Sequence, residues 1–158
     1  MGKNTFRIIV DGNALDQMTS ELIFGPIFFD TGGSFFPEFE WTDFPLVIIS
    51  WFSKVVMELP LKQNKTFEVD FLEGPFKLKL KLDNHNNCVV ALIEGEKLAG
   101  SKEEIIETIT VPFNFLFEEV ITACKALFES VKKSKGLKKS KDYEDLETAY
   151  NLLLKFNR

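Results

Sequence analysis

The chain has 158 residues, a net formal charge of −5, 45% hydrophobic residues and 27% charged residues. These values are those of one globular domain, residues 1–158, and exclude a disordered chain, which would be poorer in aliphatic and aromatic side chains. The acidic balance disfavours nucleic acid as a partner, because phosphate binding needs clustered lysine and arginine.

The first elements are two predicted strands. Residues 6–10 are a short β-prone run that ends at a turn signal, Asp11-Gly12-Asn13. Residues 22–29 predict a second strand, followed by a loop at residues 30–34. Gly25-Pro26 indicates that this strand is bent or lies at an edge, because proline cannot donate to a sheet ladder.

An aromatic segment follows. Eight of the seventeen phenylalanines and both tryptophans fall between Phe24 and Phe52. Side chains this large must pack into a core or meet a partner. Phe44 and Phe52 are expected in the core, and Trp41 is expected to be partly exposed.

Residues 46–59 predict a helix that is apolar on nearly every side and therefore mostly buried. Asp43 is a candidate N-cap, Pro45 suits the first turn, and Pro60 limits the end.

Residues 66–72 and 76–82 alternate between apolar and polar side chains, which predicts a hairpin with a two-residue turn at Glu73-Gly74. This register places opposite charges across from each other on the solvent face, Asp70 with Lys77 and Glu68 with Lys79. Residues 88–94 and 104–111 predict two further strands, with a loop at residues 95–101 between them. The four strands form an antiparallel meander.

Two helices close the chain. Asn114 is a candidate cap for the first, with Glu118 and Glu119 expected in its first turn. Residues 135–141 are a basic linker, and Asp142 is expected to cap the last helix. The predicted fold class is α+β: an antiparallel β-meander sheet of about four to six strands, one inserted helix and two C-terminal helices.

Several residues with chemical potential have simpler interpretations. Cys88 and Cys124 are expected to be reduced, buried thiols, with a disulfide as the alternative. His85, the lone histidine, lies in a polar turn, and a single histidine excludes sites built from several histidines. No cofactor and no metal are expected.

Two groups of small or basic residues could bind anions. Gly32-Gly33-Ser34 lacks the spacing of a phosphate-binding loop and favours a flexible turn. The six lysines of residues 132–141 favour a solvated helix end and linker over a phosphate site. Lys77, Lys79 and Lys81 favour the solvent face of a sheet.

The acids beside Trp41 leave three interpretations open. Glu38, Glu40 and Asp43 alternate with aromatic residues, which favours a loop with its aromatics inward, its acids outward and Asp43 as a cap. The second interpretation is an exposed binding patch made by Glu38, Glu40 and Trp41, since aromatics ringed by charge are typical of binding hot spots. The third is a catalytic carboxylate pair.

A family resemblance enters at FFPEFEWTDFP, residues 35–45, followed by Ser50-Trp51-Phe52 and by FLEGPF at residues 71–76. Over residues 6–134 the chain resembles small bacterial proteins that are similar in size and element order to the immunity proteins of polymorphic toxin systems. The resemblance implies a cytoplasmic protein that binds and blocks a cognate toxin domain, which could be basic. It carries over no functional residue.

The expected function is therefore non-enzymatic protein binding, most concretely the neutralisation of a bacterial toxin. One alternative is a housekeeping binding or assembly subunit that forms a homodimer through a sheet edge. Another, from a different class, is an enzyme that uses carboxylates of residues 38–43. Neither a membrane span nor a secretion signal is evident in the sequence, so a cytoplasmic location is expected.

Overall fold

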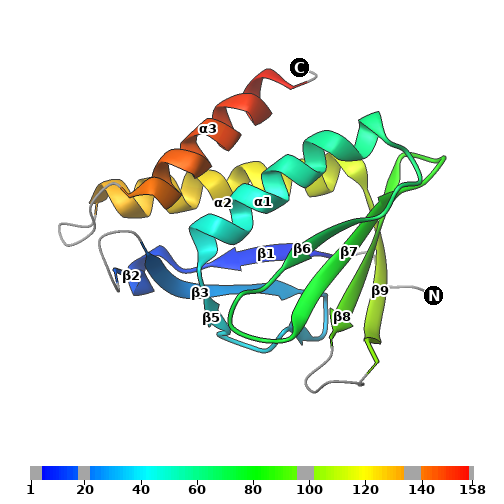
Figure 1. The fold of residues 1–158 in the computed structure, drawn as a ribbon, viewed down its shortest axis with the longest axis horizontal. Helices are drawn as coiled ribbons and strands as arrows, with labels where there is room; N and C mark the ends of the chain where they lie inside the picture. Colours follow the sequence, from blue (N-terminus) through cyan, green and yellow to red (C-terminus); the bar gives the residue numbers. More distant parts are fainter. Residues whose placement is uncertain (1–4, 18–21, 96–101, 134–139, 157–158) are drawn as a thin grey trace.

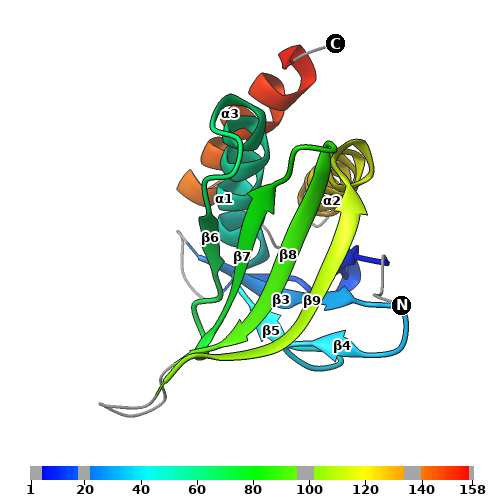
Figure 2. The same cartoon turned by 90° about the vertical axis from the view of Figure 1, so that its right-hand side faces the viewer.

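Two antiparallel sheets and three α-helices make up the computed structural model, which describes residues 5–17, 22–95, 102–133 and 140–156. Helix α1 (Pro45–Glu58) joins the two sheets, and α2 (Phe113–Lys133) and α3 (Lys141–Lys155) end the chain. The helices lie together on one side of the first sheet, and the second sheet lies across one end of this arrangement (Figures 1 and 2). The α+β class with an inserted helix and two C-terminal helices is thus confirmed.

Strand β3 (Ile23–Asp30) is the centre of the first sheet and pairs antiparallel with four short strands. These are β1 (Arg7–Val10), β2 (Asp16–Gln17), β4 (Phe35–Phe36) and β5 (Thr42–Asp43). Of the two alternatives predicted for this strand, bent or at an edge, the edge position is wrong, because β3 has partners on both sides. Pairing with β1 ends at Ile27 and pairing with β2 begins at Phe24, so Pro26 lies in the gap between them, where a missing N–H costs no ladder bond.

The second sheet is the predicted meander. Its strands are β6 (Phe67–Asp70), β7 (Phe76–Leu82), β8 (Asn87–Glu94) and β9 (Glu104–Pro112), paired in that order. The predicted register is confirmed, with Asp70 opposite Lys77 and Glu68 opposite Lys79. The turn is longer than the expected two residues, since β6 ends at Asp70 and β7 begins only at Phe76.

The lysine side chains of this sheet form ion pairs with acids other than those directly opposite them in the register. Lys77 Nζ lies 3.3 Å from Glu68 Oε1 and 2.7 Å from Glu103 Oε2, and Lys79 Nζ lies 3.0 Å from Glu103 Oε1. The hydrogen bond that the Lys77 ammonium group donates to Glu103 is the main reason why the pKa of Lys77 is raised. The lysine row therefore occupies the face away from the core, as predicted.

Two predicted caps are displaced in the C-terminal helices. α2 begins one residue before Asn114, so this residue lies inside the helix, and Glu118 and Glu119 fall beyond its first turn. α3 is capped by Ser140, whose hydroxyl accepts a backbone N–H of the first turn, and Asp142 lies within that turn.

One hydrophobic core runs from Phe6 to Leu153 and contains side chains of both sheets and all three helices. Phe52 is fully buried at its centre, with its ring 6.3 Å from that of Phe6, as predicted for a core residue. Cys88 and Cys124 are also buried as free thiols. Burial raises the pKa of Cys88 to about 12 and that of Cys124 to about 11.

Parts of two predicted segments lie outside the described residues. These are residues 96–101 of the loop between β8 and β9, and residues 135–139 of the basic linker. Among the helices that the structure describes, none combines the length and the apolar character needed to cross a bilayer.

Candidate protein-binding surface

Both faces of β3 are apolar, but helices cover only one of them. Ile23, Ile27 and Phe29 are fully buried in the core that α1 helps to form. Because side chains alternate along a strand, Phe24 and Phe28 point to the opposite face. No helix or strand within the described part of the chain lies over that face in Figures 1 and 2.

Three phenylalanines form a cluster on the uncovered face. The ring centroids of Phe28 and Phe35 are 5.7 Å apart, those of Phe28 and Phe39 are 5.6 Å apart, and those of Phe35 and Phe39 are 5.1 Å apart. Phe28 is only 5% exposed, although it is not part of the main core. The two rings that pack on it are themselves 44% and 60% exposed. The cluster is therefore a second, surface-lying apolar unit.

The apolar surface extends along β3 towards the start of α1. Phe24 and Phe44 meet edge to face at 5.3 Å, and both are half-buried, so the prediction that Phe44 is a core residue is wrong. Ile9 lies directly opposite Phe28 on the neighbouring strand. We call this surface the aromatic face; it consists of Ile9, Phe24, Pro26, Phe28, Phe35, Phe39 and Phe44.

Glu38 and Glu40 border the aromatic face, as two exposed acids on either side of Phe39. They belong to a turn in which the Trp41 N–H donates to the Glu38 carbonyl at 3.2 Å. Glu40 has a φ of 59°, in the left-handed region that costs a side-chain-bearing residue about 1–2 kcal/mol. A strained residue in an exposed turn is a reason to suspect a functional side chain.

Trp41 is half-buried, as expected, but it turns away from the two acids. Its ring packs edge to face against Phe76 at 5.3 Å and against Phe71 at 6.4 Å, both on the core side of the second sheet. Its indole N–H donates to Asp43 Oδ2 at 3.1 Å. The structure thus keeps Glu38 and Glu40 beside the aromatic face and separates Trp41 from them.

Asp43 is fully buried and does not cap α1, which corrects the sequence prediction. The N-cap residue of that helix is Phe44, with no side-chain cap bond. The Asp43 carboxylate instead accepts the backbone N–H groups of Phe44, Leu72 and Glu73, besides the indole N–H of Trp41. A buried carboxylate needs several hydrogen-bond donors, and here they come from two segments. The Asp43 side chain therefore connects the turn between β6 and β7 to the start of α1.

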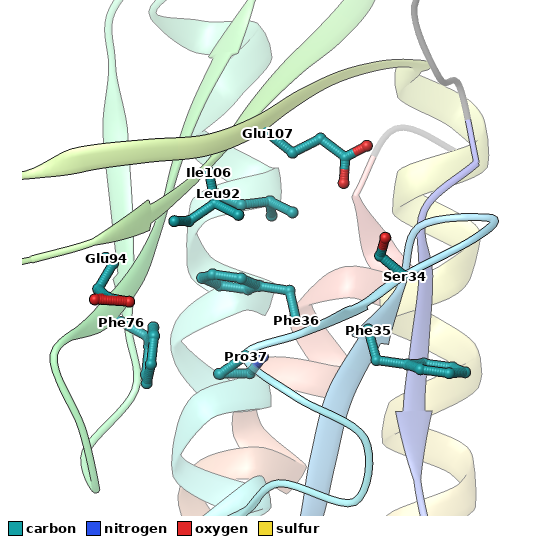
Figure 3. Close-up of a pocket in the computed structure, with 9 residues that line it drawn as sticks. All are labelled: Ser34, Phe35, Phe36, Pro37, Phe76, Leu92, Glu94, Ile106 and Glu107. Carbon is teal, nitrogen blue, oxygen red and sulfur yellow. The ribbon is translucent and has the colours of Figure 1, made fainter.

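A cavity of about 440 Å³ lies beside the aromatic face, between the strand β4 region and the second sheet. Figure 3 shows the ring of Phe36 directed into this cavity and the ring of Phe35 directed away from it. The wall on the second sheet includes Leu92, Glu94 and Glu107. The Phe35–Phe36 segment therefore joins the cavity to the aromatic face.

A β-bulge shapes the cavity wall. β8 and β9 pair in register up to Leu92 opposite Glu107, and then Ile93 lies opposite Ile105, so Ile106 is the extra residue. In a regular strand consecutive side chains point to opposite faces. Here both Ile106 and Glu107 line the cavity, since the bulge interrupts that alternation.

The remaining candidates occupy turns. His85 is exposed, and its backbone N–H donates to Asp83 Oδ1 at 2.8 Å. Gly32, with a φ of 83°, lies in the turn between β3 and β4, where its N–H donates to Asp30 Oδ1 at 2.8 Å. Within the described ranges, no group of three or more His, Cys, Asp and Glu side chains is arranged to hold a metal ion.

Sequence reasoning did not single out Phe28, Phe35 and Phe39 as surface residues. One signal was present: residues 23–29 read IFGPIFF, apolar at both odd and even positions, which is the pattern of a strand covered on both faces. Only the tertiary structure shows that one face is left uncovered.

Comparisons of the chain with protein-family models, with curated proteins and with solved structures gave no match.

Proposed function

We propose that this chain is a non-enzymatic protein-binding domain, and that it neutralises a cognate bacterial toxin by covering part of the toxin's surface. The observation that carries the proposal is the aromatic face. A surface with rings exposed by 44% at Phe35 and 60% at Phe39 is costly to leave in water. Covering it with a partner removes that apolar area from solvent.

The composition of the face supports protein recognition. Aromatic anchors near the centre of a contact carry most of the binding energy in protein interfaces, and a charged rim surrounds them. Phe28 already holds the two exposed rings of Phe35 and Phe39 in place, so little side-chain freedom is lost on binding.

The charge at the rim favours a basic partner. Arg7 and Asp30 are cross-strand neighbours and offset each other, whereas Glu38 and Glu40 leave this border acidic. The whole chain carries a net charge of −5. Opposite charge speeds association with a basic protein, such as a nuclease toxin, and like charge disfavours pairing of two copies through this face.

The geometry gives less support to an enzyme that uses residues 38–43. Glu38 and Glu40 are exposed, while Asp43 is buried with its oxygens occupied by N–H donors. A catalytic pair needs two carboxyl groups on opposite sides of one substrate bond. Here Glu38 and Glu40 lie at the surface, whereas Asp43 lies in the interior.

The test begins with capture of a partner from the cells that make this chain. The captured protein is expressed alone to see whether it arrests growth, and then together with the chain. We expect the wild type to restore growth and the double variant Phe35→Ser/Phe39→Ser to fail. Leu61→Ser is the matched control, because Leu61 is 73% exposed in the short helix η2 (Leu59–Leu61), outside the aromatic face.

A second pair of changes tests the acidic rim. Glu38→Lys/Glu40→Lys should slow association with a basic partner and reduce its dependence on salt. The proposal is wrong if the captured protein is harmless by itself, or if the Phe35→Ser/Phe39→Ser variant restores growth as well as the Leu61→Ser control does.

A further inference from the structure

We infer that β9 accepts an extended segment of the partner protein as an additional strand of the second sheet. This inference rests on the proposed protein-binding function and names the backbone chemistry through which the partner binds. β9 stands at the end of the order β6-β7-β8-β9, and it pairs only with β8 among the strands that the structure describes (Figure 2). Its other side is therefore an open sheet edge in the described part of the chain.

The hydrogen-bond pattern identifies which backbone groups of β9 face β8. In an antiparallel pair, residues that bond the neighbouring strand alternate with residues whose N–H and C=O groups point away from it. The N–H of Phe113, directly after β9, donates to the Asn86 carbonyl at 3.0 Å, so Phe113 faces β8. In steps of two back along the strand, Val111 and Ile109 face β8 as well.

Thr108 and Thr110 consequently direct their backbone N–H and C=O groups away from β8. Both lie in the regular part of the strand, after the bulge at Ile106. Pro112 is the next residue in this alternation, where its missing N–H costs no bond to β8, as is usual for proline on an edge strand. The outward side of β9 is thus a row of backbone donors and acceptors that an extended segment can pair with.

β9 lacks most of the features that keep an edge strand from pairing. Edge strands are usually short, or they are interrupted by lysine, proline or a bulge. β9 has nine residues, six of them β-branched and none of them lysine, and its bulge and its proline lie towards its two ends. At the opposite edge of the sheet, β6 has only four residues, of which Glu68 and Asp70 are charged. The sheet therefore offers one edge that suits strand addition.

The charge of β9 favours a basic segment over a second copy of this chain. β9 carries Glu104 and Glu107 and no basic residue. A second copy would place another acidic strand alongside, whereas a basic segment brings opposite charge to this edge. The side chains of Thr108 and Thr110 are exposed, and a threonine or serine on the added strand can bond to them. We expect a segment with β-branched or hydroxyl side chains and at least one lysine or arginine.

The open edge is continuous with the aromatic face. Ile106 and Glu107 of β9 line the same cavity as Phe35. Ile105 and Ile106 are 62% and 52% exposed, so this end of the strand also offers apolar side chains. A partner lying on the aromatic face can therefore extend one segment along β9 without leaving that face.

The test follows the backbone amides of the ¹⁵N-labelled chain by NMR. In the free chain, hydrogen exchange should be fast at Thr108 and Thr110 and slow at Ile109 and Val111, because only the second pair bonds β8. The probe in place of the unidentified partner is the peptide acetyl-Lys-Thr-Val-Thr-Val-Thr-Lys-amide. At saturation it should slow exchange at Thr108 and Thr110 by at least about fivefold.

Two control peptides separate backbone pairing from general attraction to an acidic protein. The same peptide N-methylated at its five central residues keeps the side chains but cannot donate backbone hydrogen bonds, so it should not slow exchange. A peptide with aspartate in place of both lysines keeps the backbone and should bind at least about threefold more weakly.

Thr110→Pro removes an outward N–H and should weaken binding of the probe peptide by at least about tenfold. Asp70→Pro is the matched control on the opposite edge. The Phe71 N–H donates to the Phe76 carbonyl at 3.0 Å, so Asp70, one residue earlier, points its N–H away from β7. This control should leave peptide binding unchanged. If Thr110→Pro does not fold, the exchange measurement on the wild type decides.

The inference is overturned if Thr108 and Thr110 already exchange slowly in the free chain, or if the N-methylated peptide acts like its parent. It is also overturned if Asp70→Pro weakens binding as much as Thr110→Pro does. Slow exchange at both threonines together with a dimeric mass in sedimentation equilibrium would show that a second copy occupies β9.

These outcomes are distinguishable from a failure of the proposed function. If the probe peptide does not bind at β9 but Phe35→Ser/Phe39→Ser fails to restore growth, the aromatic face remains and the strand addition is wrong. The same holds if Thr110→Pro restores growth as well as the wild type does. If the peptide binds at β9 and the phenylalanine variant restores growth, the open edge remains and the role of the aromatic face is wrong.

Discussion

Asp43 Oδ2 accepts the backbone N–H of Leu72 at 3.1 Å, across 29 residues of chain. The same oxygen accepts the N–H of Glu73 at 3.0 Å, and Oδ1 accepts that of Phe44 at 2.8 Å. One buried carboxylate thus joins the first sheet, the start of α1 and the β6–β7 turn. The two sheets are held in their relative positions partly through this single side chain.

Replacing this carboxylate should destabilise the whole domain. Asp43→Ala leaves the N–H groups of Phe44, Leu72 and Glu73 without their acceptor, and we expect a loss of at least about 3 kcal/mol in the free energy of unfolding. Asp43→Asn retains one oxygen and should cost about 1–2 kcal/mol. Urea denaturation measures both; Thr42→Ala, at an exposed neighbour, is the control, and equal stability of all three variants would contradict the role of Asp43.

Trp41 should contribute more to folding than its place in a loop implies. The sequence alone predicted a partly exposed Trp41, and the structure adds that its ring packs on Phe71 and Phe76 and that its indole N–H donates to Asp43. We expect Trp41→Ala to lower the free energy of unfolding by about 2–3 kcal/mol, which is less than for a fully buried tryptophan because Trp41 is half-buried.

Trp41→Phe isolates the hydrogen bond. It keeps an aromatic ring against Phe76 and should cost only about 1 kcal/mol. Thermal unfolding of the two variants gives the comparison. If Trp41→Ala leaves the melting temperature unchanged, the Trp41 ring does not contribute to the stability of the fold.

Glu40→Gly should stabilise the chain. At a φ of 59° a glutamate is disfavoured by about 1–2 kcal/mol, and glycine loses about 0.5–1 kcal/mol through its freer unfolded state. The net gain is about 0.5–1 kcal/mol. Glu38→Gly, at the other exposed acid of the turn, is the control and should lower stability. Thermal unfolding of the two variants measures the difference. A lower melting temperature for both variants would show that the backbone of Glu40 is not strained.

Phe52→Ala should cost about 3–5 kcal/mol, because its ring is fully buried against Phe6 and Phe29. The adjacent Trp51 is 36% exposed, so Trp51→Ala is the matched control on the same helix and should cost clearly less. Urea denaturation followed by circular dichroism measures both, and a larger loss for Trp51→Ala would place the centre of the core elsewhere.

The two buried cysteines should make stability fall at alkaline pH. An unfolded thiol has a pKa of about 8.5, whereas burial raises the pKa of Cys124 to about 11 and that of Cys88 to about 12. Their contribution is fully present below the unfolded pKa and is lost as the pH rises towards the folded pKa, because only the unfolded chain releases the protons.

The measurement compares the wild type with Cys88→Ala/Cys124→Ala between about pH 8.5 and 10.5. We expect the free energy of unfolding to fall more steeply for the wild type. The raised pKa of Lys77 acts in the same direction but is common to both proteins, so it cancels in the comparison. Parallel curves would show that the thiols do not titrate differently in the two states.

Local periodicity accounts for what could be predicted in the second sheet. Alternation of side chains over residues 66–82, with charges matched across the strands, predicted the register of Asp70 with Lys77 correctly. The same reasoning predicted an apolar helix where α1 lies, since Pro45 and Pro60 limit its extent. Such features depend on residues that are close in the chain.

The errors fall where distant segments meet. Asp43 was expected to bond its own helix, but the β6–β7 turn brings the N–H groups of Leu72 and Glu73 to it. Phe44 was expected in the core, but it meets Phe24 on the uncovered side of β3. Whether an apolar face is buried depends on which element packs on it, and the sequence of one strand does not predict which element that is.

The sequence by itself determined the class of fold, the meander register and the buried helix, because hydrophobic periodicity and turn residues act over a few neighbouring positions. The tertiary structure alone decided that the strands divide into two sheets, that Glu38 and Glu40 stay beside Phe39 while Trp41 turns inward, and that a cavity opens between the sheets. These features arise from packing between segments far apart in the chain, where many arrangements satisfy the same local pattern and only the complete set of contacts selects one.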